Sequence, residues 1–251
     1  VREGHLPGPV VTRTFFVDEQ NVGFPIISLV VDPAHFFDKR SGIYTQGEEP
    51  GEVAGPLTPN FERDWERSVN LAFFESDGWL AFQQDSGIKI HGGWTRRYPQ
   101  KSLRLYARNR YGKDFFSHRI FSDLPVDRFK RLILRNAGND WRTAFMRDGV
   151  AHALMSEMGL DTQAWRPVLV FLNGRYWGIH NLRDRTDSHN LAFRLGIPAD
   201  EIDLIQGYSE IRAGDFESFN QFLQFMRAAD PDDEDYFHEV GGFMDIDNFI
   251  D

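Results

Sequence analysis

The stretch of residues 87–106 reads GIKIHGGWTRRYPQKSLRLY. Apolar and β-branched residues before Gly92 and after Lys101 predict two strands joined by a glycine-containing turn. Side chains alternate between the two faces of a strand, so Lys101 shares a face with Leu103 and Leu105. We therefore expect Lys101 to have a packed aliphatic stem and an ammonium group in a confined place.

Basic side chains gather at this turn and along the strand that follows it. From Lys89 to Arg119 the chain has nine Lys or Arg residues and one acidic residue, Asp114. The whole chain carries a formal net charge of -10, so this basic island contrasts with the rest of the sequence. A concentration of positive charge in an acidic protein predicts a binding site for an anion.

Composition narrows the class of protein. The 251 residues include 23 Phe and no Cys, and this length predicts one large domain, or one with a small appendage, with a partly aromatic core. Without Cys there are no disulfides, thiol nucleophiles or Cys-ligated zinc. The eight His have no metal-ligand spacing and no apolar run reaches about 18 residues, so we expect neither a histidine metal site nor a membrane span. The chain starts at Val1 without a leader pattern, which predicts a mature or excised product.

Turn residues separate several predicted strands. Asp77-Gly78 and Asn173-Gly174 are typical of tight turns, and each lies between two apolar runs, so we predict two β-hairpins. The predicted strands are 10–17, 24–31, 69–74, 79–82, 131–135, 165–172, 176–182 and 202–206. Phe36 and Phe37 should anchor a short helical turn, followed by an extended piece at 41–44 and a surface loop at 47–59.

Three segments have apolar residues at helical spacing: 143–158, 188–195 and 216–228. The first should begin at a Thr143 cap, end before Gly159 and place its apolar residues in the core. Those residues are Ala144, Phe145, Val150, Ala151, Leu154, Met155 and Met158. Hairpins combined with separate helices predict the α+β class, with a mixed, largely antiparallel sheet.

Six segments follow one another along the chain: TRTFFVDE (12–19), PIISLVVDPAHFFDKRSGIY (25–44), IKIHGGWTRRYPQKSLRLYAR (88–108), RLILRNAGNDW (131–141), MRDGVAHALMSEMGL (146–160) and RPVLVFLNGRYWGIHNLRDRTD (166–187). Taken in this order, they resemble the spore coat protein H (CotH) kinase family. The resemblance implies an atypical, protein kinase-like fold that binds ATP with magnesium and phosphorylates Ser or Thr of partner proteins. We expect residues 61–251 to form this domain and residues 1–60 to belong to it or lead into it.

The sequence departs from the family pattern at a few places. The family usually has two basic residues where Gln100-Lys101 stand, and usually Glu where Asp184 stands. Its Asn and Asp residues for metal binding and catalysis lie downstream of a segment that resembles Asp245–Asp251. We therefore expect this chain to be the half that binds the nucleotide phosphates, without the C-terminal catalytic part and inactive as a fragment.

The resemblance implies which side chains would contact the nucleotide. Lys101 matches the phosphate-binding lysine, and Asp184 is the candidate acid that would keep it ionised and in position. Arg96 and Arg97 flank the turn and would either clamp phosphate oxygens or pair with surface acids. Arg183 has the same two interpretations, and we assign no metal ligand.

An Asx-rich loop at Asn136, Asn139 and Asp140 has two interpretations. Its oxygens would suit magnesium, but such loops also cap the helix that follows, and we favour capping with Asp140 paired to Arg147. Asp148, on that helix, could equally take an arginine from the basic island.

A second class of function is a non-catalytic surface or coat-assembly module whose basic island binds an anionic polymer or an acidic partner. Its binding would weaken with salt and be indifferent to magnesium. We do not expect nucleic-acid binding, because the net charge is -10 and residues 200–251 contain fifteen acids and two bases. By resemblance the protein is bacterial, with a protein substrate and an extracellular, cell-surface or spore-coat location.

Overall fold

The computed structural model describes residues 10–18, 23–48, 58–207 and 209–250, and its centre is a closed barrel in the order β1-β2-β3-β4-β7-β9-β8. The strands are β1 Ile26–Val30, β2 Arg67–Phe74, β3 Leu80–His91, β4 Ser102–Tyr106, β7 Arg131–Arg135, β8 Trp165–Leu172 and β9 Arg175–Asp184. Neighbours are antiparallel except β1 and β8, which are parallel. The predicted α+β class with a largely antiparallel sheet is confirmed, and kinase-like topology stays a prediction.

Both hairpins form at the turns that the sequence predicted. Gly78 donates its backbone N–H to the Glu75 carbonyl at 2.9 Å in the turn from β2 to β3. In the turn from β8 to β9, Asn173 and Gly174 have φ of 49° and 77°, the left-handed pair that a tight hairpin turn requires. The meander of β2, β3 and β4 is also confirmed, and it places Lys89 of β3 opposite Arg104 of β4, with the rest of the basic island in the connections beside these strands.

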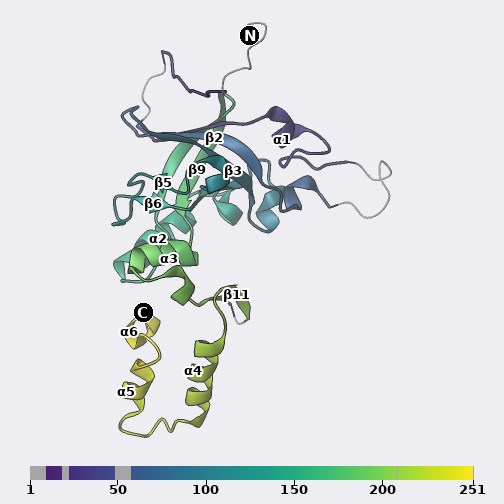
Figure 1. Ribbon diagram of the computed structural model, residues 1–251. Coiled ribbons are helices and arrows are strands. Elements are labelled where there is room, and N and C mark those ends of the chain that lie inside the picture. Colours follow the sequence, from purple (N-terminus) through teal and green to yellow (C-terminus); the bar gives the residue numbers. More distant parts are fainter. Residues whose placement is uncertain (1–9, 19–22, 49–57, 208, 251) are drawn as a thin grey trace.

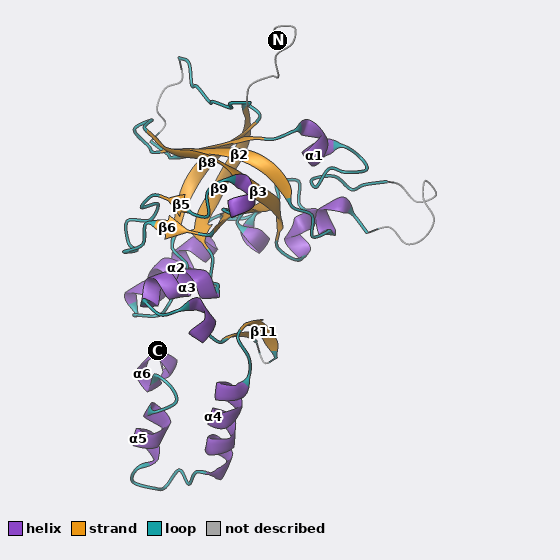
Figure 2. Cartoon of the chain, in the orientation of Figure 1, coloured by secondary structure: helices purple, strands orange, loops and turns teal. Residues whose placement is uncertain are grey.

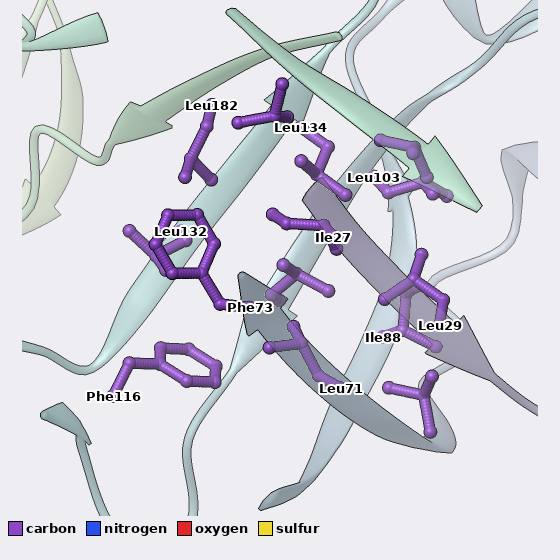
Figure 3. Close-up of a cluster of buried hydrophobic side chains, with 14 of the residues drawn as sticks. Ile27, Leu29, Leu71, Phe73, Ile88, Leu103, Phe116, Leu132, Leu134 and Leu182 are labelled. Atoms are coloured by element: carbon purple, nitrogen blue, oxygen red, sulfur yellow. The ribbon is translucent and has the colours of Figure 1, made fainter. Parts of the chain in front are cut away.

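The barrel interior is apolar, and side chains from all its strands meet there (Figure 3). Alternation puts Leu103 and Leu105 inside, as predicted, and leaves the residues between them on the outer face. Other interior residues are Ile27, Leu29, Leu71, Phe73, Ile88, Leu132, Leu134, Val168 and Leu182. The core therefore fixes which side chains of β4, β7 and β9 point outward.

Helices lie beside and beyond the barrel (Figures 1 and 2). They are α1 Pro33–Phe37, α2 Arg147–Glu157, α3 Ser188–Leu195, α4 Glu217–Ala228, α5 Tyr236–Gly241 and α6 Ile246–Ile250; two small sheets pair β5 Phe116–Ser117 with β6 Arg128–Phe129 and β10 Leu204–Gln206 with β11 Glu210–Ala213. The predicted elements at 188–195, 202–206 and 216–228 and the turn at Phe36 are confirmed. Within the described ranges, no helix has both the length and the apolar character needed to cross a bilayer.

The predicted strand at 10–17 is wrong, because these residues pair with no strand. Both edges of β1 are already occupied, one by β2 and the other by β8, so barrel closure leaves no edge for another strand. The segment lies on the outside instead, where the Phe16 ring packs edge-on against Phe74 and Phe171. The extended piece predicted at 41–44 is a set of turns, and residues 49–57 of the predicted loop lie outside the described residues.

The helix predicted at 143–158 begins four residues late, and Thr143 is not its cap. The Asp140 carboxylate accepts the backbone N–H groups of Ala144 and Arg147 at 3.2 and 3.0 Å and the Thr143 hydroxyl. Phe145 takes a left-handed φ of 66°, which interrupts helical geometry before Arg147. The Asp140 carboxylate therefore binds the backbone just before and at the start of the helix, in place of the Thr143 cap that the sequence predicted.

The prediction that α2 buries its apolar residues is also wrong. Gly149 is the buried residue of α2, and a Cβ there would lie 2.9 Å from the Trp165 indole. The helix therefore approaches the barrel through its glycine and its charged side. Its apolar face is exposed, by 42–63% at Val150, Leu154, Met155 and Met158.

Candidate functional site

The basic island around the glycine turn is paired with acids from the segment before β2. Arg97 lies 2.8 Å from Glu62, Arg108 lies 3.1 Å from Glu66, and Lys89 contacts Asp64. Arg110 also contacts Glu66, and Arg96 donates to the carbonyls of Gly92 and Glu62. The anion that this island faces is, in large part, the protein's own acidic segment, and an external anionic partner is not favoured.

The Lys101 ammonium group is buried and already satisfied. It donates to the carbonyls of Arg96 and Tyr98 at 2.7 and 2.9 Å and lies 4.3 Å from the centre of the Phe61 ring. The residue is 5% exposed, and burial lowers the pKa of its ammonium group to about 8. The confined ammonium group predicted for Lys101 is confirmed, and its observed role is to hold the segment after the turn.

Asp184 does not meet Lys101. In the sheet it lies opposite Leu132, which in turn lies opposite Leu105, four residues along β4 from Lys101. The nearest cation to its carboxylate is Arg194, at 3.6 Å. Burial raises the pKa of Asp184 to about 7 despite that neighbour, and its Oδ1 has no hydrogen-bond partner. The ion pair expected between Asp184 and Lys101 is therefore wrong.

Outward-facing arginines converge on β4, β7 and β9. Register places Arg104 opposite Ile133 and Ile133 opposite Arg183, so the two arginines lie on the same outer face of the sheet. Other arginines at outward positions extend this group along β7 and past the end of β9. We name as the arginine face the set Arg104, Arg131, Arg135, Arg183 and Arg185.

Two carboxylates hold four of these arginines. Asp148, from α2, lies 3.1 Å from Arg135 and 2.5 Å from Arg183. Asp187, the N-cap of α3, lies 2.8 Å from Arg131 and 3.6 Å from Arg185. Four cations thus share two anions, and with Arg104 as the fifth cation the face has an excess of positive charge.

Arg183 is the least satisfied member of the arginine face. It is 1% exposed, and none of its three guanidinium nitrogens has a hydrogen-bond acceptor. The close contact with Asp148 is electrostatic but lacks hydrogen-bond geometry. Burial lowers the pKa of Arg183, and the Arg135 charge acts in the same direction. A buried cation without acceptors is costly, and such orphan donors point to a missing partner.

Arg104 has no carboxylate partner among the described residues. It donates to Nδ1 of His91 at 2.6 Å and to the Tyr106 hydroxyl at 3.1 Å, while its own Nε is buried without an acceptor. Because Nδ1 accepts, the His91 proton is on Nε2. Burial and then the charges of nearby arginines, Arg104 first, lower the pKa of His91 to about 3, so this imidazole is neutral at pH 7.

The Asx-rich loop after β7 serves the fold. Asp140 caps α2 and lies 3.4 Å from Arg147, as predicted. The buried Asn136 accepts the Ser102 hydroxyl at 2.8 Å and the Gly138 N–H at 3.0 Å, whereas Asn139 is exposed. No group of three His, Asp or Glu suited to a metal ion occurs within the described ranges.

The sequence pointed to Arg183 but missed the other four arginines of the face. The signal was present in the strand alternation, since SLRLY places Arg104 between two buried leucines, and RLILR and NLRDR place arginines directly beside a buried leucine. What was lacking was the pairing of β4 with β7 and of β7 with β9, which brings these positions side by side. Asp148 was predicted as a possible partner of an arginine from the basic island, but its partners are Arg135 and Arg183, which lie outside that island. Asp187 could be found only once α3 was placed against the sheet.

The family model described as CotH kinase protein matches residues 88–251. The matched region includes the glycine turn, Lys101, the arginine face and both carboxylates that hold it. A search of curated proteins found no match. Because the family match covers well over half of the sequence, this chain belongs to the CotH kinase protein family.

Proposed function

We propose that the arginine face binds the phosphates of ATP, as part of an atypical protein kinase that transfers phosphate to Ser or Thr of a partner protein. One observation carries this proposal: Arg183 is buried, and none of its three donor nitrogens makes a hydrogen bond, although the Asp148 carboxylate lies nearby. Phosphoryl transfer relies mainly on positive charge that is already in place around the phosphate oxygens. Membership of a kinase family makes ATP the anion to test first.

Phosphate oxygens would relieve the charge imbalance of this face. Guanidinium groups bind phosphate through two parallel hydrogen bonds, and each phosphate offers several acceptors. Burial, and next the Arg104 charge, lower the pKa of Arg185, which indicates that these cations repel one another. A polyanion that enters the face would lower the free energy of all of them together.

Each residue has a distinct task in this proposal. Arg104, which has no carboxylate to exchange, receives the anion first, and the Nε2–H of the neutral His91 is an additional donor. Asp148 and Asp187 hold the remaining arginines in position while the face has no ligand. Lys101 acts from behind by fixing the segment that follows the turn.

Direct contact of Lys101 with phosphate, as the family resemblance implies, requires its ammonium group to leave two carbonyls. Arg96 and Arg97 would likewise have to leave Glu62 and its backbone carbonyl. We therefore propose Arg183 and Arg104 as the principal phosphate ligands and Arg96, Arg97 and Lys101 as residues that shape the turn. Asp184 has no place in this set, because its neighbour is Arg194.

Magnesium use is proposed from family membership alone. Bound magnesium would neutralise charge on the phosphate oxygens. The described residues offer no cluster of three metal-ligating side chains, so we assign no ligand and derive no step through the metal. We also propose a protein substrate and a surface or spore-coat location, both from the family, and one domain that includes β1 because this strand closes the barrel.

Calorimetric titration with ATP and magnesium tests this function. The Arg183→Met and Arg104→Gln variants should each bind ATP roughly tenfold or more weakly, because each loses charge-assisted hydrogen bonds. Lys113→Gln is the matched control, since Lys113 is an exposed cation of the basic island, and it should change affinity less than about twofold. Unchanged ATP affinity in Arg183→Met, or no binding by the wild type, would overturn the proposal. Phosphate incorporation into a protein acceptor tests transfer separately.

A further inference from the structure

A small cavity lies beside Tyr106, where β4 ends and β7 begins, near the start of α3. Its volume is about 130 Å³, and we name it the Tyr106 pocket. Its principal lining residues are Tyr106, Arg108, Asp114, Lys130, Arg131 and His189. A cavity of this volume has room for one tetrahedral oxyanion.

Positive charge exceeds negative charge around the Tyr106 pocket. Lys130 lies 2.7 Å from Asp114, the acid in the lining. Arg108 shares Glu66 with Arg110, and the Asp187 that holds Arg131 also serves a second arginine. The two shared acids therefore leave charge uncompensated beside a cavity that is closed on one side by an aromatic ring.

The cations that line the Tyr106 pocket have N–H groups that are not used in hydrogen bonds. Lys130 has three N–H groups and uses one of them on Asp114, and Arg131 has five and uses one on Asp187. The Nε of Arg108 is buried without an acceptor. Burial, and next the Arg131 charge, lower the pKa of His189, and a neutral imidazole still offers one N–H. Donors without acceptors around a cavity of this size match the geometry of a phosphate group.

Tyr106 orders these cations. Its ring lies 4.6 Å from the Arg108 guanidinium carbon and 5.9 Å from that of Arg131, and Lys89 approaches at 5.6 Å. Tyr106 itself is buried, so its ring is a fixed surface against which the cations are held. Cations held in this way would lose little conformational freedom when an anion binds.

We propose that the Tyr106 pocket is a second anion site, which binds one phosphate monoester group separately from Arg104 and Arg183, the principal ligands of ATP. The cavity volume suits one phosphate group. Arg108 and Lys130 lie outside the arginine face, and Arg131 is the residue that the pocket shares with it. The source of the group is either a phosphorylated side chain of a peptide or a free phosphate compound. Both present the same dianion, with oxygens in reach of several donors.

Titration with inorganic phosphate tests the site. Lys130→Gln should weaken phosphate binding by about tenfold, since it removes a charged donor from the lining. Lys113→Gln, an equal change of charge on an exposed residue outside the lining, should alter phosphate affinity less than about twofold. Circular dichroism and thermal unfolding confirm that both variants are folded. Absence of phosphate binding by the wild type, or equal affinities of the two variants, would overturn the proposal.

Two further measurements separate this site from ATP binding and identify the source. Arg183→Met should keep the wild-type affinity for inorganic phosphate while its affinity for ATP falls. Lys130→Gln should keep the affinity for ATP while its affinity for inorganic phosphate falls. If ATP displaces phosphate completely and Arg183→Met loses both ligands, there is a single site and the proposal fails. A phosphoserine peptide that binds more tightly than inorganic phosphate, with no binding by its unphosphorylated form, supports a protein source. Equal affinity for phosphopeptide and inorganic phosphate supports a free phosphate compound.

Discussion

Lys101, beside the glycine turn, and Arg183, near the end of β9, are both cations buried in the barrel wall. The Lys101 ammonium group has two carbonyl acceptors and an aromatic ring, whereas Arg183 has three orphan nitrogens and the adjacent Asp184 has an orphan oxygen. Burial alone therefore does not distinguish a structural charge from a functional one. Hydrogen bonding does distinguish the two kinds of charge. A buried polar group that makes no hydrogen bond lowers the stability of the fold, so its presence calls for a functional explanation.

The largest expected effect concerns Asp184 and pH. Its pKa is raised to about 7, so the folded protein keeps a proton that the unfolded chain releases near pH 4. Stability from this group is therefore greatest below about pH 4 and falls as pH rises to about 7, by on the order of 3 kcal/mol. Urea unfolding of the wild type and Asp184→Asn across that range measures the difference. A pKa of Asp184 below 4 would mean that it has a strong cationic partner, and the contrast with Lys101 would fail.

The second expected effect is a loss of stability when Lys101 is changed. Lys101→Met keeps the stem but leaves the carbonyls of Arg96 and Tyr98 without their donor, which should cost roughly 2 to 3 kcal/mol. Lys130→Met is the matched control and should cost less than about 1 kcal/mol, because its ion pair is partly exposed. Denaturant midpoints with unchanged slopes measure both variants. Equal losses would show that Lys101 does not have the structural role assigned to it.

The smallest expected effect has the opposite sign. Arg183→Met replaces a buried cation that makes no hydrogen bond by an apolar side chain, and the partly exposed Asp148 keeps its contact with Arg135, so the protein should gain about 1 kcal/mol. Thermal and urea unfolding measure this gain in the absence of ligand. A loss as large as that of Lys101→Met would mean that Arg183 supports the fold in the same way. A gain in stability combined with weaker ATP binding would separate the two kinds of buried charge.

Local chemistry explains what could be predicted from the sequence. The turn dipeptides Asp77-Gly78 and Asn173-Gly174 require particular backbone angles, so both hairpins were recognisable. Alternation around Leu103 and Leu105 identified the buried face of β4 and the burial of Lys101. The predicted end of α3 at residue 195 is confirmed, because the next residue, Gly196, takes the left-handed conformation. Each of these features depends on residues close together in the chain.

Contacts between distant residues explain the failures. Nothing near residue 10 signals that β1 is already paired on both edges, one of them with β8 through Ile26 and Leu169. The apolar residues of α2 have the usual helical spacing, yet the helix approaches Trp165 through Gly149 and leaves those apolar residues exposed. The arginine face requires the order of three strands, and its two acids come from helices elsewhere. The candidate site therefore depends on contacts between distant residues to a greater degree than the individual strands and helices do.

Closure of the main sheet by the parallel pair of β1 and β8 has a consequence for recognition. Because β1 is paired on both sides, it presents no row of unpaired backbone amides and carbonyls. An incoming peptide therefore cannot add a strand beside β1, although strand addition is a common way for proteins to hold extended segments. Proteins that dock over β1 must be selected by side-chain shape and charge, and strand-to-strand aggregation through β1 has no starting point.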